Sequence, residues 1–282
     1  METLYEMRGY LTEPYRLFHL RDHQTGIIDW HYHTFHKILF FLAGEGTYDV
    51  EGRQFELRSG DVIFVPRGCI HRPEISPREE YERYILYIDP EYLKRLSRPE
   101  CDLETCFERA RKTASFVVRP AERGELLRRL KALEAAPLDE AFGSSLLAEG
   151  LFLRLLITLT RATEPHLARP VSPGADPKVL AILRYLTDHL SEPVSADDLA
   201  GRFRLSKYHM MRKFKQATGY TIHGYLTSKR LVLARELTES GVTATAACYQ
   251  SGFQDYSAFS RAYKKQFGAP PGRRGAPKEL SD

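Results

Sequence analysis

Short apolar runs separated by turn residues fill the region between residues 37 and 65. KILFFL, TYDV, RQFEL and DVIFV are separated there by AGEG, EG and RSG. Runs of this length bounded by glycine and polar residues are typical of antiparallel strands joined by hairpin turns. Several such strands at close spacing predict a barrel or a sandwich.

The periodicity changes after Pro120, where leucines recur at helical spacing. ERGELLRRLKALEAA and EAFGSSLLAEGLFLRLLITLTRA contain no strand punctuation and therefore predict two helices. Leu147, Leu151 and Leu155 form an apolar ridge on the second helix. The ridge fits two interpretations equally well: packing against the barrel, or contact between two copies of the chain.

A proline-rich stretch without periodicity, TEPHLARPVSPGADP, follows these helices and is typical of an interdomain linker. Every later segment has a helical pattern. Pro177 begins the first of these helices, and Ser195 and Ser206 are placed to cap the next two. The sequence thus predicts an N-terminal domain, a linker and a helical domain, at residues 1–162, 163–176 and 177–282.

Composition and charge narrow the class of protein. Of 282 residues, 43% are hydrophobic and 11% aromatic, which is typical of globular domains. From Asp176 onward 17 Lys and Arg stand against 10 Asp and Glu, a net charge of +7, while the preceding part has a net charge of −3. A basic domain joined to a different one is typical of nucleic-acid-binding proteins, although a solvated basic face would give the same count.

The chain shows no sign of export or of a membrane partner. METLYEMRGY lacks the apolar core of a signal peptide, and Arg154 interrupts the longest apolar stretch, LFLRLLITL. The four cysteines, Cys69, Cys101, Cys106 and Cys248, have no C-x-x-C spacing. These features predict a cytoplasmic protein with reduced cysteines.

An internal repeat lies in the basic part of the chain. YHMMRKFKQATG aligns without gaps on SAFSRAYKKQFG, so that Arg212 aligns with Arg261 and Gly219 with Gly268. A short helical segment precedes each copy, and HGYLTSKRLVLARELTES between them has the length of a rigid connecting helix. This order predicts two helix-turn-helix units. The second helices of the two units are expected to bury one apolar face each, made by Met210, Phe214, Ala217, Phe259, Tyr263 and Phe267.

Two such units on one frame suit duplex DNA. An arginine near the helix N-terminus can form a bidentate contact with guanine in the major groove, and a lysine can neutralise a phosphate. Recognition helices about 34 Å apart would enter successive major grooves on one side of the duplex. The alternative is a four-helix packing domain with a charged surface.

The segments DLAGRFRLSKYHMMRKFKQATG, YLTSKRLVLARELT and YQSGFQDYSAFSRAYKKQFGAPP resemble the DNA-binding domain of the AraC/XylS transcriptional regulators. The resemblance covers most of residues 178–271 and implies that the partner is double-stranded promoter DNA. It also implies a homodimer, with RNA polymerase as a further candidate partner. The DNA-binding residues that it implies are Ser206, Lys207, Tyr208, Met211, Arg212, Lys215, Tyr256, Ser257, Ser260, Arg261 and Lys264.

The chain departs from the family pattern in two places. Ala244 and Ala247 stand where isoleucines are usual before the second recognition helix, and Cys248 replaces an alanine. Weaker packing of the second unit is therefore expected. The Tyr-Arg pair usual after the final proline is absent, and Arg273 and Arg274 lie nearby instead.

The segment HYHTFHKILF, residues 31–40, supplies candidate ligand-binding side chains. His31, His33 and Lys37 lie on one face of an extended strand, because side chains alternate with a period of two. Two histidines at this spacing suit a metal ion, whereas a lysine ammonium has no lone pair and repels one.

The resemblance also implies a cupin-like barrel before the DNA-binding domain, and GDVIFVPRGCIH, which ends at His71, matches the second cupin motif. In the first motif the glutamate that binds a metal would stand at residue 37, where this chain has Lys37. The asparagine usual after His71 is missing as well. A site of two histidines and one carboxylate thus lacks its anionic ligand, so we expect no resident metal or other cofactor.

A small polar effector is expected in this barrel instead. Imidazoles and an ammonium can bond hydroxyl, carboxylate or phosphate groups, and aromatic rings can stack on a sugar. For each side chain an ordinary structural role inside the barrel is the alternative. The candidate effector-binding residues are His31, His33, Lys37, His71, Trp30 and Tyr48.

The expected fold class is α+β and multidomain, with an N-terminal cupin-like β-barrel, dimerisation helices, and a C-terminal all-α domain that contains two helix-turn-helix motifs. The expected function is ligand-responsive regulation of transcription. By analogy with the family, the regulated genes serve sugar or carbohydrate metabolism, and the effector is a sugar, sugar acid or sugar phosphate. The alternative is a metal-dependent cupin enzyme, an isomerase or dioxygenase, fused to a DNA-binding module.

Overall fold

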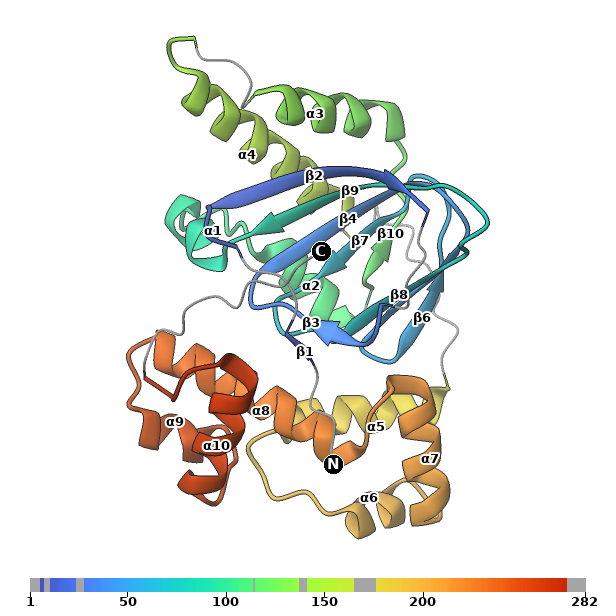
Figure 1. Ribbon diagram of the computed structural model, residues 1–282, viewed down its shortest axis with the longest axis vertical. Coiled ribbons are helices and arrows are strands. Elements are labelled where there is room, and N and C mark those ends of the chain that lie inside the picture. The colour runs from blue at the N-terminus through green and yellow to red at the C-terminus, as the bar shows by residue number, and fades with distance from the viewer. Residues whose placement is uncertain are drawn as a thin grey trace.

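Two sheets form the N-terminal part of the protein. The computed structural model describes residues 6–7, 11–23, 28–113, 115–136, 141–164 and 176–272. Within these residues the strands are β1 (Glu6–Met7), β2 (Tyr15–Asp22), β3 (His31–Tyr32), β4 (His36–Ala43), β5 (Gly46–Val50), β6 (Arg53–Glu56), β7 (Val62–Val65), β8 (His71–Ile75), β9 (Tyr81–Ile88) and β10 (Val117–Val118). They form two five-stranded sheets, in the orders β1-β3-β8-β5-β6 and β10-β7-β4-β9-β2, which face each other as an open barrel (Figure 1).

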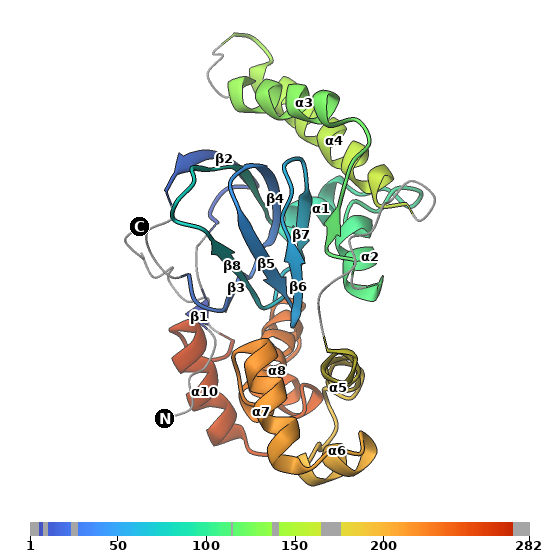
Figure 2. The same cartoon turned by 90° about the vertical axis from the view of Figure 1, so that its right-hand side faces the viewer.

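Helices cover one side of the barrel and form the rest of the chain. The first group consists of α1 (Pro90–Leu96), α2 (Thr105–Thr113), α3 (Arg123–Ala135) and α4 (Ser144–Ala162). The second group consists of α5 (Pro177–Asp188), α6 (Ala196–Arg202), α7 (Lys207–Thr218), α8 (Ile222–Glu239), α9 (Ala244–Gln250) and α10 (Tyr256–Phe267). Figure 2 shows the second group below the barrel and the hairpin of α3 and α4 above it.

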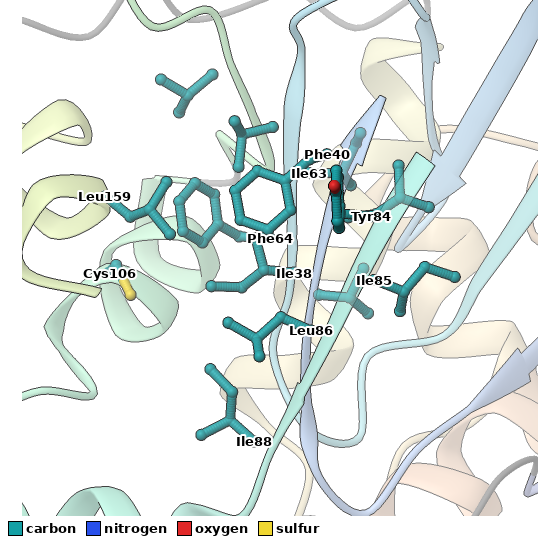
Figure 3. Packing of buried hydrophobic residues seen from close by; sticks show 14 of the residues in the cluster. Ile38, Phe40, Ile63, Phe64, Tyr84, Ile85, Leu86, Ile88, Cys106 and Leu159 are labelled. Carbon is teal, nitrogen blue, oxygen red and sulfur yellow. The ribbon is translucent and has the colours of Figure 1, made fainter. Parts of the chain in front are cut away.

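Strand β4 is apolar on both of its faces because both faces of its sheet are covered. Ile38 points from β4 toward α2 and α4, where it packs with Leu159 and Cys106 (Figure 3). Lys37, its neighbour, faces the opposite sheet, with its Nζ 5.8 Å from the ring centroid of Tyr48 in β5. Because the sheet is covered on both faces, alternation brings Lys37 into the barrel while the next residue enters the core between sheet and helices.

The predicted strands between residues 37 and 65 are confirmed as β4 to β7, and the two predicted helices after Pro120 as α3 and α4. The two ends of the apolar ridge on α4 lie in different surroundings. Leu155 is fully buried against the barrel, whereas Leu147 is 56% exposed near the free end of the hairpin. Packing is thus shown for one end of the ridge only.

The helical part has the predicted caps and buried faces. Ser195 and Ser206 accept backbone hydrogen bonds at the starts of α6 and α7, and Gly219 ends α7 in the left-handed conformation. The faces predicted to be buried are buried at Met210, Phe214, Phe259, Tyr263 and Phe267, and only partly at Ala217.

The departures from the family pattern lie in α9 and at the C-terminus. Ala247 and Cys248 are fully buried where α9 packs on its neighbours, so small side chains fill these positions. The expected weaker packing of this unit stays a prediction. Most of the predicted linker, together with Arg273 and Arg274, lies outside the described residues.

Candidate DNA-binding surface and effector site

The first recognition helix, α7, exposes the side chains that the sequence assigns to DNA. Ser206, which caps the helix, is exposed, as are Lys207 and Lys215. Tyr208 and Met211 are 76% and 40% exposed. Large apolar side chains exposed together are typical of a surface that binds a partner. Arg212 is exposed as well, and its guanidinium carbon lies 6.0 Å from the Tyr208 ring centroid.

The second recognition helix, α10, presents a similar but less exposed set. Ser257, Arg261 and Lys264 are exposed, whereas Tyr256 and Ser260 are half-buried. The Tyr256 ring lies 5.8 Å from that of the buried Phe259, so part of this tyrosine belongs to the domain core.

One predicted phosphate contact already has a protein partner. The Lys207 Nζ lies 2.8 Å from an Asp197 carboxylate oxygen, with both side chains largely exposed. An exposed ion pair of this kind contributes little to stability, so a phosphate can replace the carboxylate at small cost.

Three histidines meet inside the barrel, as strand parity predicts for two of them. His31 on β3 pairs directly with His71 on β8, and each ring of the set His31, His33 and His71 is buried. One ligand nitrogen from each of the three lies within 4.8 Å of the others. The ring centroids of His31 and His71 are 4.2 Å apart.

Backbone carbonyl groups fix the tautomers of two rings. The Nδ1 of His71 is 3.0 Å from the Cys69 carbonyl oxygen, and the Nδ1 of His31 is 2.7 Å from that of Asp29. A carbonyl oxygen only accepts, so each Nδ1 bears a proton, and a neutral ring in this tautomer has its lone pair on Nε2. Burial, and then the charges of His31 and Lys37, hold the pKa of His71 well below its ordinary value, so this ring is neutral.

Lys37 completes the cluster as a buried cation. Its side chain is 6% exposed. Burial, with the charge of Arg83 acting in the same direction, lowers the pKa of Lys37 from 10.5 to about 7, and among the described residues no carboxylate offsets the shift. Since the charge of Lys37 also lowers the pKa of His71, the ammonium and the imidazoles lie within electrostatic range of one another.

The three imidazoles alone have the donor type that a transition metal requires. A tetrahedral ion with bonds of about 2.0 Å would hold its nitrogen ligands roughly 3.4 Å apart, so the rings would have to close in. A dication would also face the ammonium of Lys37. The expectation that the barrel has no resident metal stays a prediction.

Trp30 and Tyr48, the two aromatic candidates, lie in different places. Tyr48 is fully buried, and its ring is stacked on His71 with 5.9 Å between centroids. Trp30 lies instead against the end of α7, where a Cβ on Gly219 would be 2.3 Å from the Trp30 ring. The Tyr220 hydroxyl donates to the Trp30 carbonyl oxygen at 3.1 Å. Trp30 thus packs at the interface with the helical domain, and its predicted place among the effector-binding side chains stays a prediction.

The sequence analysis missed the interface between the barrel and the helical domain. Glu51, in the turn between β5 and β6, accepts hydrogen bonds from the Tyr225 hydroxyl at 2.7 Å and the Lys229 Nζ at 2.6 Å. It also accepts one from the Ile70 amide at 2.6 Å. Lys229 further donates to the Gly68 carbonyl oxygen at 2.8 Å. Contacts between residues so far apart in the chain leave no periodic signal in a sequence.

The segment around β3 joins this interface to the histidine cluster. His31 and His33 face the barrel interior, while Trp30 and Tyr32 pack in the core cluster of the helical domain. The Tyr32 hydroxyl accepts a hydrogen bond from Gln266, on the last turn of α10. One short segment therefore contacts the candidate effector site, the C-terminal end of α7 and the last turn of α10.

A barrel with a polar interior, joined to two helix-turn-helix units that expose basic and aromatic side chains, defines a DNA-binding transcriptional regulator with a ligand-binding domain. Family models agree with both halves: residues 14–156 match an AraC-like ligand binding domain, and residues 199–274 match a helix-turn-helix domain. The chain belongs to the AraC family of transcriptional regulators. It is a regulator and not an enzyme.

Relatives extend over most of the chain. The HTH-type transcriptional activator RhaS of Yersinia pestis is 28% identical over 252 residues, which are 86% of each chain. A solved structure of ToxT from Vibrio cholerae is 13% identical, covers 92% of this chain and 97% of that one, and has a TM-score of 0.37. The DNA-binding domain of AdpA, solved with a target DNA, is 23% identical, covers 34% of this chain and 87% of that one, and has a TM-score of 0.33. Among the described residues, every helix is too short or too polar to span a membrane.

Proposed function

We propose that the protein adjusts its binding to promoter DNA in response to a small polar effector held among His31, His33, Lys37, His71 and Tyr48. The observation that supports this proposal most directly is the segment around β3, which contacts the histidines on one face and the helical domain on the other. The relative RhaS is named as a transcriptional activator. Control of sugar or carbohydrate genes is proposed by analogy with the family.

The DNA-binding residues are part of this proposal. Tyr208, Met211 and Arg212 would read bases from α7, and Tyr256, Ser257, Ser260 and Arg261 from α10. Ser206, Lys207, Lys215 and Lys264 would contact the phosphate backbone. Two recognition helices in one helical domain fit successive major grooves of the duplex.

Effector control would be a coupling free energy between barrel and DNA. An effector that draws His31 and His33 inward moves the backbone that holds Trp30 and Tyr32 against the helical domain. Effector binding would then favour one relative arrangement of the two domains over another. That arrangement would set the distance between α7 and α10.

The proposed homodimer forms through the hairpin of α3 and α4. Phe142, Leu146 and Leu147 near its free end are 108%, 75% and 56% exposed. A group of large apolar side chains that projects from the barrel is typical of a protein–protein contact. We place the dimer in the cytoplasm, at a promoter, where RNA polymerase is a further partner.

The test of this function is a thermal-shift screen of the full chain against sugars, sugar acids and sugar phosphates, since a ligand that binds the native state alone raises its apparent stability. Each hit is then added to a fluorescence anisotropy titration of a promoter duplex. The proposal requires that at least one hit change the DNA affinity. If DNA affinity stays constant with every hit, the barrel does not control the DNA-binding domain.

Glu51→Gln is expected to loosen the contact between the domains. The substitution keeps the shape of the side chain but removes the charge that holds Lys229 and the Tyr225 hydroxyl. Charge-assisted hydrogen bonds of this type are each worth about 1.5 to 3 kcal/mol, and glutamine keeps one of the two accepting oxygens, so we expect the free energy of unfolding to fall by about the worth of one such bond. Calorimetry of the full chain measures it.

Glu56→Gln is the matched control, because Glu56 lies on the adjacent strand β6 with its side chain exposed. We expect this control to unfold like the parent. The Glu51 variant should also respond less to the effector in DNA binding. Unchanged unfolding together with an unchanged response would show that Glu51 is not part of the coupling.

A further inference from the structure

We propose that the effector is a hydroxylated anion, such as an aldonic or uronic acid, whose anionic group binds Lys37 and one of whose hydroxyls donates to His71. This inference rests on the proposed function and names the chemical class of its ligand. Two side chains in the barrel support it, and they require opposite hydrogen-bonding partners: Lys37 requires an acceptor, and the Nε2 of His71 requires a donor.

The first group is Lys37, a buried amine that no acid of the described residues balances. Asp22 on β2 and Asp49 on β5 each lie near an arginine: Asp22 is 2.7 Å from Arg83 and Asp49 is 3.5 Å from Arg72. The charged form of Lys37 is therefore disfavoured both by its burial in surroundings of low polarity and by the nearby cation Arg83. An ammonium in such a place is stabilised by an anion and repels a dication.

The second group is the Nε2 of His71, which requires a donor. Its lone pair follows from the Nδ1–H that donates to the Cys69 carbonyl oxygen. The Nε2 itself is buried and makes no hydrogen bond to the described residues. A carboxylate or phosphate oxygen cannot satisfy a lone pair, whereas a hydroxyl can.

Tyr48 adds a donor beside this acceptor. Its hydroxyl is also buried without a partner among the described residues, and its ring is stacked on that of His71. One ligand hydroxyl can donate to His71 and accept from Tyr48. A neutral sugar would leave Lys37 without an anion, and a carboxylate without hydroxyls would leave His71 without a donor. A ligand with both groups satisfies all three side chains.

The experiment is isothermal titration of the full chain with gluconate, glucuronate and galacturonate, with glucose and galactose as neutral counterparts and hexanoate as an anion without hydroxyls. We expect at least one sugar acid to bind tenfold or more tightly than its neutral counterpart and than hexanoate. Lys37→Met should reduce that affinity at least tenfold, and Tyr48→Phe should reduce it by a smaller factor. Lys94→Met is the matched control, because Lys94 pairs with Glu91 on the exposed face of α1, and it should bind like the parent.

Each other outcome overturns the inference in a recognisable way. A neutral sugar that binds as tightly as its acid would remove the role of Lys37 while leaving the proposed function in place. Equal binding of hexanoate would remove the role of the hydroxyl. Failure of all three acids, together with one equivalent of Co²⁺ or Zn²⁺ bound by the parent and lost in His71→Ala, would make the cluster a metal site. Failure of all ligands in the wider screen to alter DNA binding would instead overturn the proposed function.

Discussion

Replacing Lys37 with methionine is expected to stabilise the folded protein by roughly 4 kcal/mol at pH 7 and below. Burial lowers the pKa of this lysine from 10.5 to about 7 in the folded state. The unfolded chain therefore binds more protons than the folded chain between these two values, so the stability of the parent rises with pH across that window. Each pKa unit corresponds to about 1.4 kcal/mol. Methionine keeps the stem and removes the charge.

The measurement is denaturant unfolding of parent and variant at pH 6.5 and pH 9.5, with Lys94→Met as control. The gain from Lys37→Met should be largest at the lower pH and small at the higher one, because the lysine of the parent is then already neutral in the folded state. Arg83, Tyr48 and His71 lie near Lys37. Because the charge of Lys37 lowers the pKa of His71, its removal also relieves His71, which adds to the gain at the lower pH. A gain that does not change with pH would mean that Lys37 remains charged and solvated.

Arg212→Ala and Arg261→Ala are each expected to weaken specific DNA binding by about 1 to 3 kcal/mol. Both guanidinium groups are exposed on recognition helices, at equivalent positions of the two repeats. Each substitution should relax the base preference at a separate place in the operator, one turn of DNA apart. Fluorescence anisotropy with single-base variants of the operator measures both effects.

Lys215→Ala provides the contrast on the same helix. As an exposed phosphate contact, Lys215 should contribute equally to all sequences, so its loss should weaken binding uniformly and flatten the dependence on salt. An arginine variant that lost affinity for specific and random DNA to the same extent would have its arginine on the phosphate backbone and not on a base.

Local signals in the sequence were sufficient for part of the fold. Periodicity predicted β4 to β7, α3, α4 and the helices from Pro177 onward, Ser195 and Ser206 predicted caps, and the offset between the repeats predicted both recognition helices; the remaining strands and the helices α1 and α2 were not predicted. Strand parity predicted His31, His33 and Lys37 on one face of a single strand, whereas the structure has a bend at residues 34–35 and places β3 and β4 in different sheets. These side chains come together because both sheets face the barrel interior.

Long-range geometry accounts for what the sequence did not reveal. Trp30 neighbours His31 in the chain, and alternation points the two to opposite sides, but only the fold shows that the side opposite the barrel is occupied by α7. In the sequence Glu51 looks like an ordinary residue of a hairpin turn, because its partner Tyr225 is 174 residues away. The tautomer of His71 depends on the Cys69 carbonyl oxygen, whose direction no residue type specifies.

The central claim is that α7 and α10 read two segments of one operator. Selection of duplexes from a random-sequence pool by the full chain, followed by sequencing, tests it most directly. The account predicts two clusters of preferred bases whose centres are about 10 base pairs apart, with the cluster read by α10 lost in the Arg261→Ala variant and the other retained. A single cluster, or a pool without sequence preference, would contradict it.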